Sequence, residues 1–451
     1  MVCLDSKNRL WLAFSTRESH WWPAAAKPRP DGYIVLLDEK GARIVGDGVY
    51  MMGESWSSDY IQLAFRIDKL FQSLIELPFV DYYFGPPACK AQVQDEQAQE
   101  PMALLHAATT LLDALPAQGF NQHRTTYLSK QVGAMEMVCR KLCGEQFSLE
   151  EEMQRLFDLS FSWTPEAQFD EALTLYNEAL PGKGDIARRL HKWRRQHAIP
   201  WEKSTQLPSL VERILGELRR RTLVFIDLPA NESVDLRIEI ENSFGGACWY
   251  QGNYRSHIEV NIDAFLRMQT HVNVLIDTLC REAYPGHHVA YSLKEQHLYR
   301  ELGYEEETIG LLFSPSAVIG EGIATSACEM IFSPIELEEW LAENVYAELG
   351  IKQDRADVLK IQQAEDLLAG VWGNAIALLR AGHSHEEIKA YLTRYLRQGD
   401  VAFWEQPFHE FFGIVEASAK QLMHPWLQGT DRHQVFRRYL MEQFYPSELV
   451  K

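Results

Sequence analysis

Residues 221–263 constrain the fold most, because their apolar side chains alternate with a period of two. The stretches "TLVFIDLP", "VDLRIEIEN" and "ACWYQGNYRSHIEVNID" are rich in β-branched and aromatic residues, and Asn-Ser and Gly-Gly separate them. This pattern is typical of strands bounded by turns. We therefore expect a small antiparallel sheet of three or four strands, inserted between two longer segments of a different character.

On both sides of this segment, apolar residues recur every three or four positions, which indicates amphipathic helices. One of these helices has a clear start signal, because Ser148 is followed three residues later by Glu151, the spacing of a capping box. The sequence predicts a mainly α fold: a helical half at 58–220, the small sheet at 221–263, and a second helical half at 264–451.

The N-terminal extension, residues 1–57, has a different pattern. Its stretch "YIVLLDEKGARIVG" places apolar alternations on both sides of a Lys-Gly turn, which favours a short hairpin; a poorly structured extension is the alternative. No basic segment followed by an apolar run begins the chain, and its seven cysteines are scattered. We expect reduced thiols and a cytoplasmic protein.

The charge of the chain restricts its partners. The formal net charge is −19, from 44 Lys and Arg against 63 Asp and Glu. Binding to nucleic acid or to anionic membranes requires clustered cations, so we expect neither partner. No apolar run reaches the length of about 18 residues that a membrane-spanning helix needs.

The stretch "CREAYPGHHVAY", residues 280–291, holds the strongest functional signal. Pro-Gly breaks an otherwise helical pattern, and two histidines follow at once. In a straight helix Glu282 and His287 would point about 140° apart. If the break absorbs two residues, they acquire the relation of the glutamate and second histidine in HExxH, where the histidines bind zinc and the glutamate is the general base.

A catalytic zinc needs three protein ligands and an open position. His287 and His288 can supply one or two of them, and Glu321 in "GEGIATSACE" is the best candidate for another. Glu282 would then be the general base. The alternative is a kinked helix that carries two imidazoles in a scaffold without a cleft function.

The stretches "REAYPGHHVAYSLKE" and "FSPSAVIGEGIATSACE" resemble bacterial proteins of unknown function that carry an HE-x-[YF]-PGHH motif followed by EG-x-A. Those proteins are similar to gluzincin zinc metallopeptidases. The stretches "LPFVDYYFGP" at 77–86 and "CWYQGNYRSHIEVN" at 248–261 also fit this group, and the resemblance spans roughly residues 58–450.

The resemblance implies a mainly helical fold with a substrate cleft and zinc held by the motif's first histidine, a PGHH histidine and the EGxA glutamate. It also implies an edge strand before the motif helix that aligns an extended peptide by β-augmentation. Candidate substrate-binding residues on that strand segment are Trp249, Tyr250, Asn253 and His257. Tyr439, on a late helix, is a candidate for stabilising the oxyanion.

One residue departs from this motif. Its first position holds Arg281, which stays protonated and cannot bind a metal. Three outcomes remain open: His287, His288 and Glu321 form a rearranged site, Cys280 substitutes for the missing ligand, or Arg281 pairs with a glutamate in place of the metal. The first hypothesis is therefore a zinc-dependent peptidase-like hydrolase, and the second is a metal-free relative that binds peptides or a protein partner.

Overall fold

The computed structural model describes residues 55–239, 245–269 and 271–450, together with the backbone of four N-terminal strands. Those strands pair in the order β1-β2-β3-β4, and each pair is antiparallel. Their bounds are β1 Val2–Leu4, β2 Leu10–Ser15, β3 Gly32–Asp38 and β4 Gly41–Val45. In the hairpin of β3 and β4, Asp38 lies opposite Gly41.

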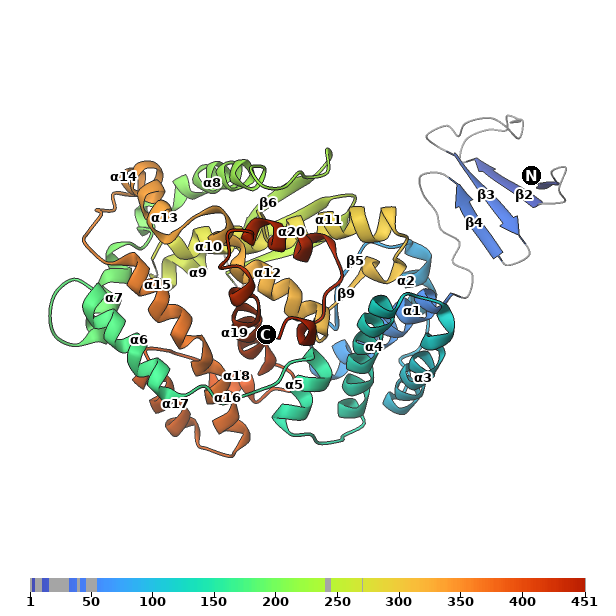
Figure 1. Ribbon diagram of the computed structural model, residues 1–451, viewed down its shortest axis with the longest axis horizontal. Helices are drawn as coiled ribbons and strands as arrows, with labels where there is room; N and C mark the ends of the chain where they lie inside the picture. The colour runs from blue at the N-terminus through green and yellow to red at the C-terminus, as the bar shows by residue number, and fades with distance from the viewer. Residues whose placement is uncertain are drawn as a thin grey trace.

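The fold is mainly α, as the apolar periodicity predicts (Figure 1). The helices before the small sheet are α1 Trp56–Ile75, α2 Pro87–Gln94, α3 Pro101–Ala114, α4 Gln122–Leu142, α5 Leu149–Phe157, α6 Glu166–Ala179, α7 Ile186–Gln196 and α8 Leu207–Thr222. The helices after it are α9 Ile262–Met268, α10 Asn273–Glu282, α11 His287–Lys294, α12 Pro315–Ile331, α13 Pro334–Leu341, α14 Ala347–Leu349, α15 Val358–Leu367, α16 Val371–Arg380, α17 His385–Arg394, α18 Val401–Trp404, α19 Phe411–Met423 and α20 Arg432–Met441. Within the described ranges, no helix is long and apolar enough to cross a bilayer.

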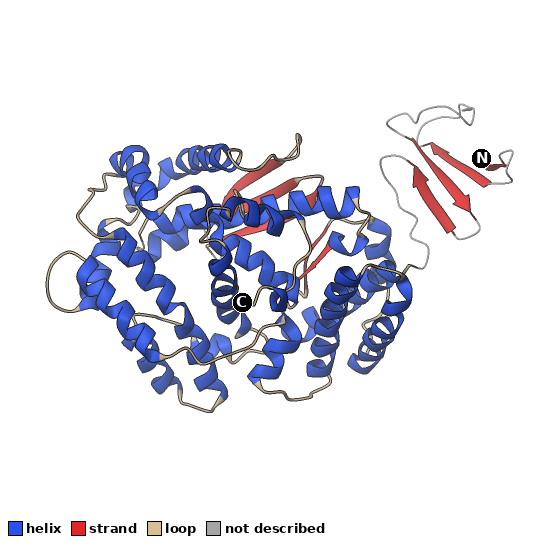
Figure 2. Ribbon diagram, viewed as in Figure 1, coloured by secondary structure: helices blue, strands red, loops and turns tan. Residues whose placement is uncertain are grey.

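The small sheet consists of β6 (Ser233–Glu239), β7 (Gly246–Gly252) and β8 (Arg255–Asn261) in the order β6-β8-β7 (Figure 2). β7 and β8 are antiparallel, as expected, but β6 pairs with β8 in parallel. The sheet is therefore mixed rather than antiparallel. β8 lies between the two strands that precede it in the sequence and runs parallel to one of them and antiparallel to the other. β8 is the central strand, and β7 is an edge strand of this sheet.

A separate two-stranded ladder joins the two helical halves of the chain. β5 (Val80–Tyr83) pairs antiparallel with β9 (Ile309–Leu311), which brings a strand from each half together. β5 also lies close to β7, as the distance of 6.2 Å between the ring centroids of Tyr82 and Tyr250 shows. The first helical half therefore contributes side chains to the region around α10 and α11, the two helices that carry the stretch at 280–291.

Two hydrophobic cores meet at α12. One core is built largely by the helices of the first half and by α15–α19, and the other by α8, the sheet, α9–α13 and α20. Val318 on α12 belongs to the first core, whereas Ile319 and Ile323 on the same helix belong to the second. Figure 1 shows α12 near the centre of the helical body. Glu321, on this shared helix, therefore lies where the two cores meet.

Candidate functional site

The Pro-Gly break separates two helices instead of bending one. α10 ends at Glu282, α11 begins at His287, and the N–H of Gly286 donates to the carbonyl oxygen of Cys280 at 2.9 Å. A Cβ atom at position 286 would lie 1.9 Å from the carbonyl oxygen of Arg281. Only glycine fits this close approach, so the sequence places Gly286 where the backbone folds back against the end of α10.

Arg281 forms the centre of the site. Its Nη2 atom donates to Glu321 Oε2 at 3.0 Å and to Glu416 Oε1 at 2.8 Å. These two carboxylates come from α12 and α19, so the guanidinium connects three helices. The pKa of Arg281 is raised above its ordinary value: burial opposes the charge, but the neighbouring carboxylates outweigh that effect. Arg281 therefore supplies a fixed positive charge at the motif's first position.

His287 lies beside this ion pair as a neutral imidazole. Its Nε2 atom is 3.5 Å from Glu321 Oε1, and its ring stacks on Tyr291 with the centroids 5.6 Å apart. Burial, with the charge of Arg281 adding to it, lowers the pKa of His287 to about 3. The imidazole therefore carries no charge at neutral pH.

His288 points to a different environment. Its Nδ1 atom is 2.8 Å from Ser256 Oγ and its Nε2 atom is 2.9 Å from Glu232 Oε2, and the residue is fully buried. Tyr284 and Arg219 donate to the same glutamate. Both ring nitrogens thus have partners within the fold, and His288 ties α11 to the sheet. Its role as a metal ligand stays a prediction.

The pKa values of two carboxyl groups near Arg281 are raised. Burial raises the pKa of Glu282 to about 8; Arg281 opposes this shift, and the charge of Glu321 adds to it. Burial and the charge of Glu321 raise the pKa of Asp81 to about 6, although a hydrogen bond from Tyr291, 3.3 Å away, opposes the rise. At neutral pH Glu282 is therefore mostly protonated and Asp81 mostly ionised.

Glu282 has no hydrogen-bond partner among the described residues, although its side chain is only 8% exposed. It lies against the start of the edge strand, since a Cβ atom at Gly246 would be 3.3 Å from Glu282 Cγ. A buried carboxyl group with a raised pKa and no partner is characteristic of a functional position. The general-base role that the motif predicts for Glu282 stays a prediction.

β7 presents an unpaired edge next to these residues. The N–H of Asn261 donates to the carbonyl oxygen of Gly245, so in this antiparallel ladder the backbone groups of Gly246 and Cys248 point away from β8. They have no hydrogen-bond partner in the described part of the chain. Trp249, on the same strand, is 43% exposed.

The other predicted substrate-binding residues lie elsewhere. Tyr250 is buried and donates to Glu295 Oε2 at 2.5 Å, and the N–H of Asn253 donates to the same carboxylate at 3.1 Å. Both residues fix the turn end of β7 to the helix that follows α11. These polar groups have hydrogen-bond partners within the fold, and the substrate-binding roles of Tyr250 and Asn253 stay predictions.

His257 and Tyr439, whose substrate-binding roles also stay predictions, have contacts within the fold. His257 lies on the central strand β8 rather than on an edge, and its Nδ1 atom is 3.1 Å from Asp235 Oδ2. Tyr439 is 2% exposed and packs against Phe444 in the second core. Burial raises the pKa of Tyr439 to about 12, so its hydroxyl stays protonated. The structure does not bring either residue to Arg281.

The residues around Arg281 do not fit the predicted zinc ion. Of the expected ligands, only His287 and Glu321 lie together, and the second oxygen of Glu321 is bonded to the guanidinium. Cys280 is fully buried in the second core. Within the described ranges, no group of three or more His, Cys, Asp or Glu side chains has the arrangement of a metal site. A zinc ion also repels an adjacent guanidinium.

Three residues of the site were not singled out from the sequence. Asp81 belongs to the stretch "LPFVDYYFGP". The likeness of this stretch to the motif-bearing proteins was the signal that could have marked Asp81 as a site residue. Tyr291 follows His287 by one helical turn. If the helix is assumed to continue past the break, this spacing places the two side chains on the same face. Glu416 is 135 residues from Arg281, and no local pattern marks it.

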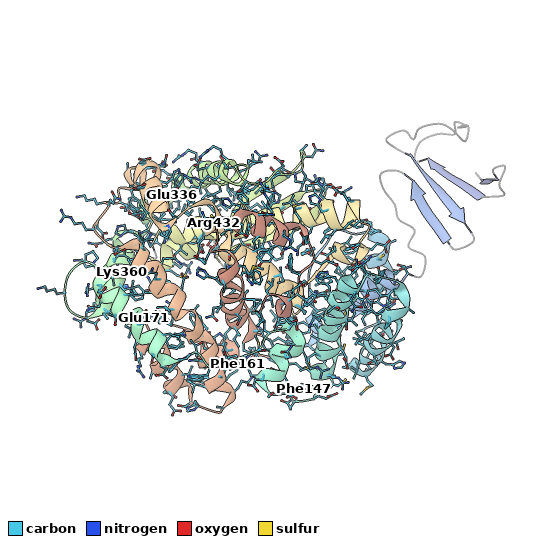
Figure 3. The ribbon with its side chains drawn as sticks, in the orientation of Figure 1. Phe147, Phe161, Glu171, Glu336, Lys360 and Arg432 are labelled. Atoms are coloured by element: carbon cyan, nitrogen blue, oxygen red, sulfur yellow. The ribbon has the colours of Figure 1, made fainter. Side chains whose placement is uncertain are left out.

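A cavity of about 530 Å³ adjoins the Arg281–Glu416 pair. Helices α7, α10, α12, α13, α15 and α19 contribute to its wall. Figure 3 labels Glu336 and Lys360, which mark α13 and α15. This volume is within the range of ligand pockets, about 300–1,000 Å³.

No family model matches the chain, and no curated protein matches it. Among solved structures, the chain is similar to the one described as "The crystal structure of the putative lipoprotein from Colwellia psychrerythraea". The two share 14% identity with a TM-score of 0.46, and the match covers 88% of this chain and 75% of the other. Similarity at this level carries no argument about function.

Proposed function

We propose that this protein binds a peptide or peptide-like ligand at a site in which Arg281 replaces a catalytic metal. The observation that carries the proposal is the ion pair of Arg281 with both Glu321 and Glu416. The guanidinium of Arg281 is a permanent cation at the motif position where the zinc-binding arrangement has a metal ligand.

Charge balance supports this proposal. Without a cation, the carboxylates of the partly exposed Glu321 and the exposed Glu416 would repel each other and the ionised Asp81. Arg281 offsets this repulsion with a group that cannot lose its proton. In the proposed site Arg281 thus balances these charges without a metal ion.

The edge of β7 supports the ligand class. Unpaired N–H and C=O groups on an edge strand bind an extended peptide by adding a strand to the sheet. At Gly246 and Cys248 these groups point away from β8, and Glu282 lies beside the first of them. The exposed ring of Trp249 offers apolar contact on the same strand.

The test compares an acetylated, amidated alanine hexapeptide with the same peptide N-methylated at alternate residues, by calorimetry on the full chain. We expect only the unmethylated peptide to bind, because strand addition needs its N–H groups. A Cys248→Pro variant removes one outward N–H of β7 and should weaken binding, while an Ala247→Gly variant keeps it and serves as the control. Equal binding of both peptides, or binding by neither, would contradict the proposal.

The expected cytoplasmic location also stays a prediction, based on the scattered cysteines. The six described cysteines are free thiols.

A further inference from the structure

Asp277 is an unpaired carboxylate in the wall of the 530 Å³ cavity. Its side chain is exposed, and no hydrogen bond or ion pair joins it to another described residue. The surrounding protein partly desolvates the carboxyl group and raises the pKa of Asp277 above its ordinary value, although the charges of Arg281 and Lys420 oppose this rise. Asp277 lies one helical turn before Arg281 on α10, so it faces the same space as the central ion pair.

The other carboxylates of this wall already have partners. Glu416 pairs with Arg281 at 2.8 Å, Glu329 with Lys420 at 2.8 Å, and Glu365 with Arg194 at 2.8 Å. Glu338 accepts a hydrogen bond from Tyr346 at 2.8 Å. The wall thus holds five carboxylates and three cations. Among the described residues, Asp277 is the wall carboxylate with no direct ion pair or hydrogen bond, and Arg281 and Lys420 act on its charge from a longer distance. This imbalance favours a cationic ligand.

Apolar side chains face the same cavity. They come from α13, α15 and the end of α12, and include Leu337, Leu341, Ile361 and Phe332. A bare inorganic cation gains nothing from such a wall, whereas a cation on an alkyl stem buries the stem against it. A lysine side chain has both parts.

Two buried N–H donors in the wall also lack an acceptor. Trp193 is 6% exposed and His271 is 4% exposed, and neither Trp193 Nε1 nor His271 Nε2 has a partner among the described residues. His271 Nδ1 accepts from the N–H of Asn273, so the ring proton is on Nε2. Both donor atoms are enclosed by protein, so they are unsatisfied groups behind the cavity surface and not contacts for its occupant.

The cavity adjoins the edge strand of the proposed peptide site. Thr278 belongs to its wall, and a Cβ atom at Gly246 would lie 2.6 Å from Thr278 Cγ2. A peptide paired with the start of β7 can therefore extend a side chain past Thr278 into the cavity.

We infer that this cavity is a specificity pocket for a basic side chain of the bound peptide, with the ammonium group of a lysine on Asp277 and its alkyl stem against the apolar wall. This inference rests on the proposed function, because it names the side chain that the same peptide site selects.

The experiment uses two capped pentapeptides, Ala-Ala-Lys-Ala-Ala and the same sequence with norleucine in place of lysine, titrated into the full chain. The caps leave the lysine as the only charge. We expect about tenfold tighter binding of the lysine peptide, in line with one hydrogen bond between charged groups. The Asp277→Asn variant should lose this preference, and Asp277→Glu should keep part of it.

Asp113→Asn is the matched control, because Asp113 is exposed on α3 and is not part of the cavity wall. It should leave the preference for lysine unchanged. Equal binding of the two peptides by the wild type, or an undiminished preference in folded Asp277→Asn, would overturn the inference and leave peptide binding standing. Binding of neither peptide would overturn both.

Discussion

Replacing Arg281 with methionine removes the cation at the centre of the site and leaves its carboxylates. The Arg281 side chain is 17% exposed and that of Glu321 is 27% exposed, whereas that of Glu416 is 53% exposed. Removing one partner of a buried ion pair costs about 3–5 kcal/mol, and an exposed pair contributes about 0–1 kcal/mol. We therefore expect Arg281→Met to lower the free energy of unfolding by about 2–3 kcal/mol at pH 7.5, between these limits.

The cost should shrink at lower pH. Glu282, with a pKa of about 8 in the fold against an ordinary value of 4.5, is already protonated at pH 5.5. Loss of Arg281 removes a charge that lowers the pKa values of Glu282 and Glu416, so their protonated forms persist to higher pH. A carboxyl group with a raised pKa stabilises the fold fully below its unfolded pKa and loses that contribution as pH rises towards its folded pKa.

Urea denaturation at pH 5.5 and pH 7.5 measures this difference. Arg438→Met is the matched control, because its ion pair with Glu442 is exposed and should contribute less than about 1 kcal/mol at either pH. An unchanged unfolding midpoint in Arg281→Met, or a loss that is no smaller at pH 5.5, would refute the reasoning.

Three further predictions concern the same region. Gly286→Ala should destabilise the protein by about 3 kcal/mol or more, because the new Cβ meets backbone 1.9 Å away; Gly320→Ala, with open space at its Cβ, should not lower the melting temperature. His288→Ala should cost about 2–4 kcal/mol in urea denaturation because it leaves buried hydrogen-bond partners unsatisfied, whereas the loss in His287→Ala should be about half of that or less. Wild-type stability should fall between pH 5.5 and pH 8, because Glu282 is ionised in the unfolded chain but largely protonated in the fold, and Glu282→Gln should flatten this dependence in the same assay.

Local sequence signals predict much of the fold. The pair Ser148 and Glu151 forms the expected capping box, and α5 begins at the next residue, Leu149. The helical periodicity on both sides of the sheet corresponds to helices for the same reason, since each pattern depends on neighbours within one turn. The direction of β6 could not be predicted, because strand order depends on which strand takes the central position.

The site shows the same limit. The break at Gly286 and the proximity of His287 to Glu321 follow from the motif, but the partner of Arg281 on α19 does not. His287 and His288 are adjacent in sequence, and only packing decides that one faces Glu321 while the other faces Glu232. Ion pairs between distant helices leave no trace in local periodicity.

The central claim is that Arg281 takes the place of a metal, and the most direct test is the zinc content of the purified full chain by elemental mass spectrometry. Wild-type protein dialysed against micromolar zinc should hold essentially none, while Arg281→His should hold about one zinc per chain, since it restores a third ligand. Arg281→Gln, which removes the cation without adding a ligand, should remain empty. About one zinc per wild-type chain, lost in His287→Ala, would contradict the account.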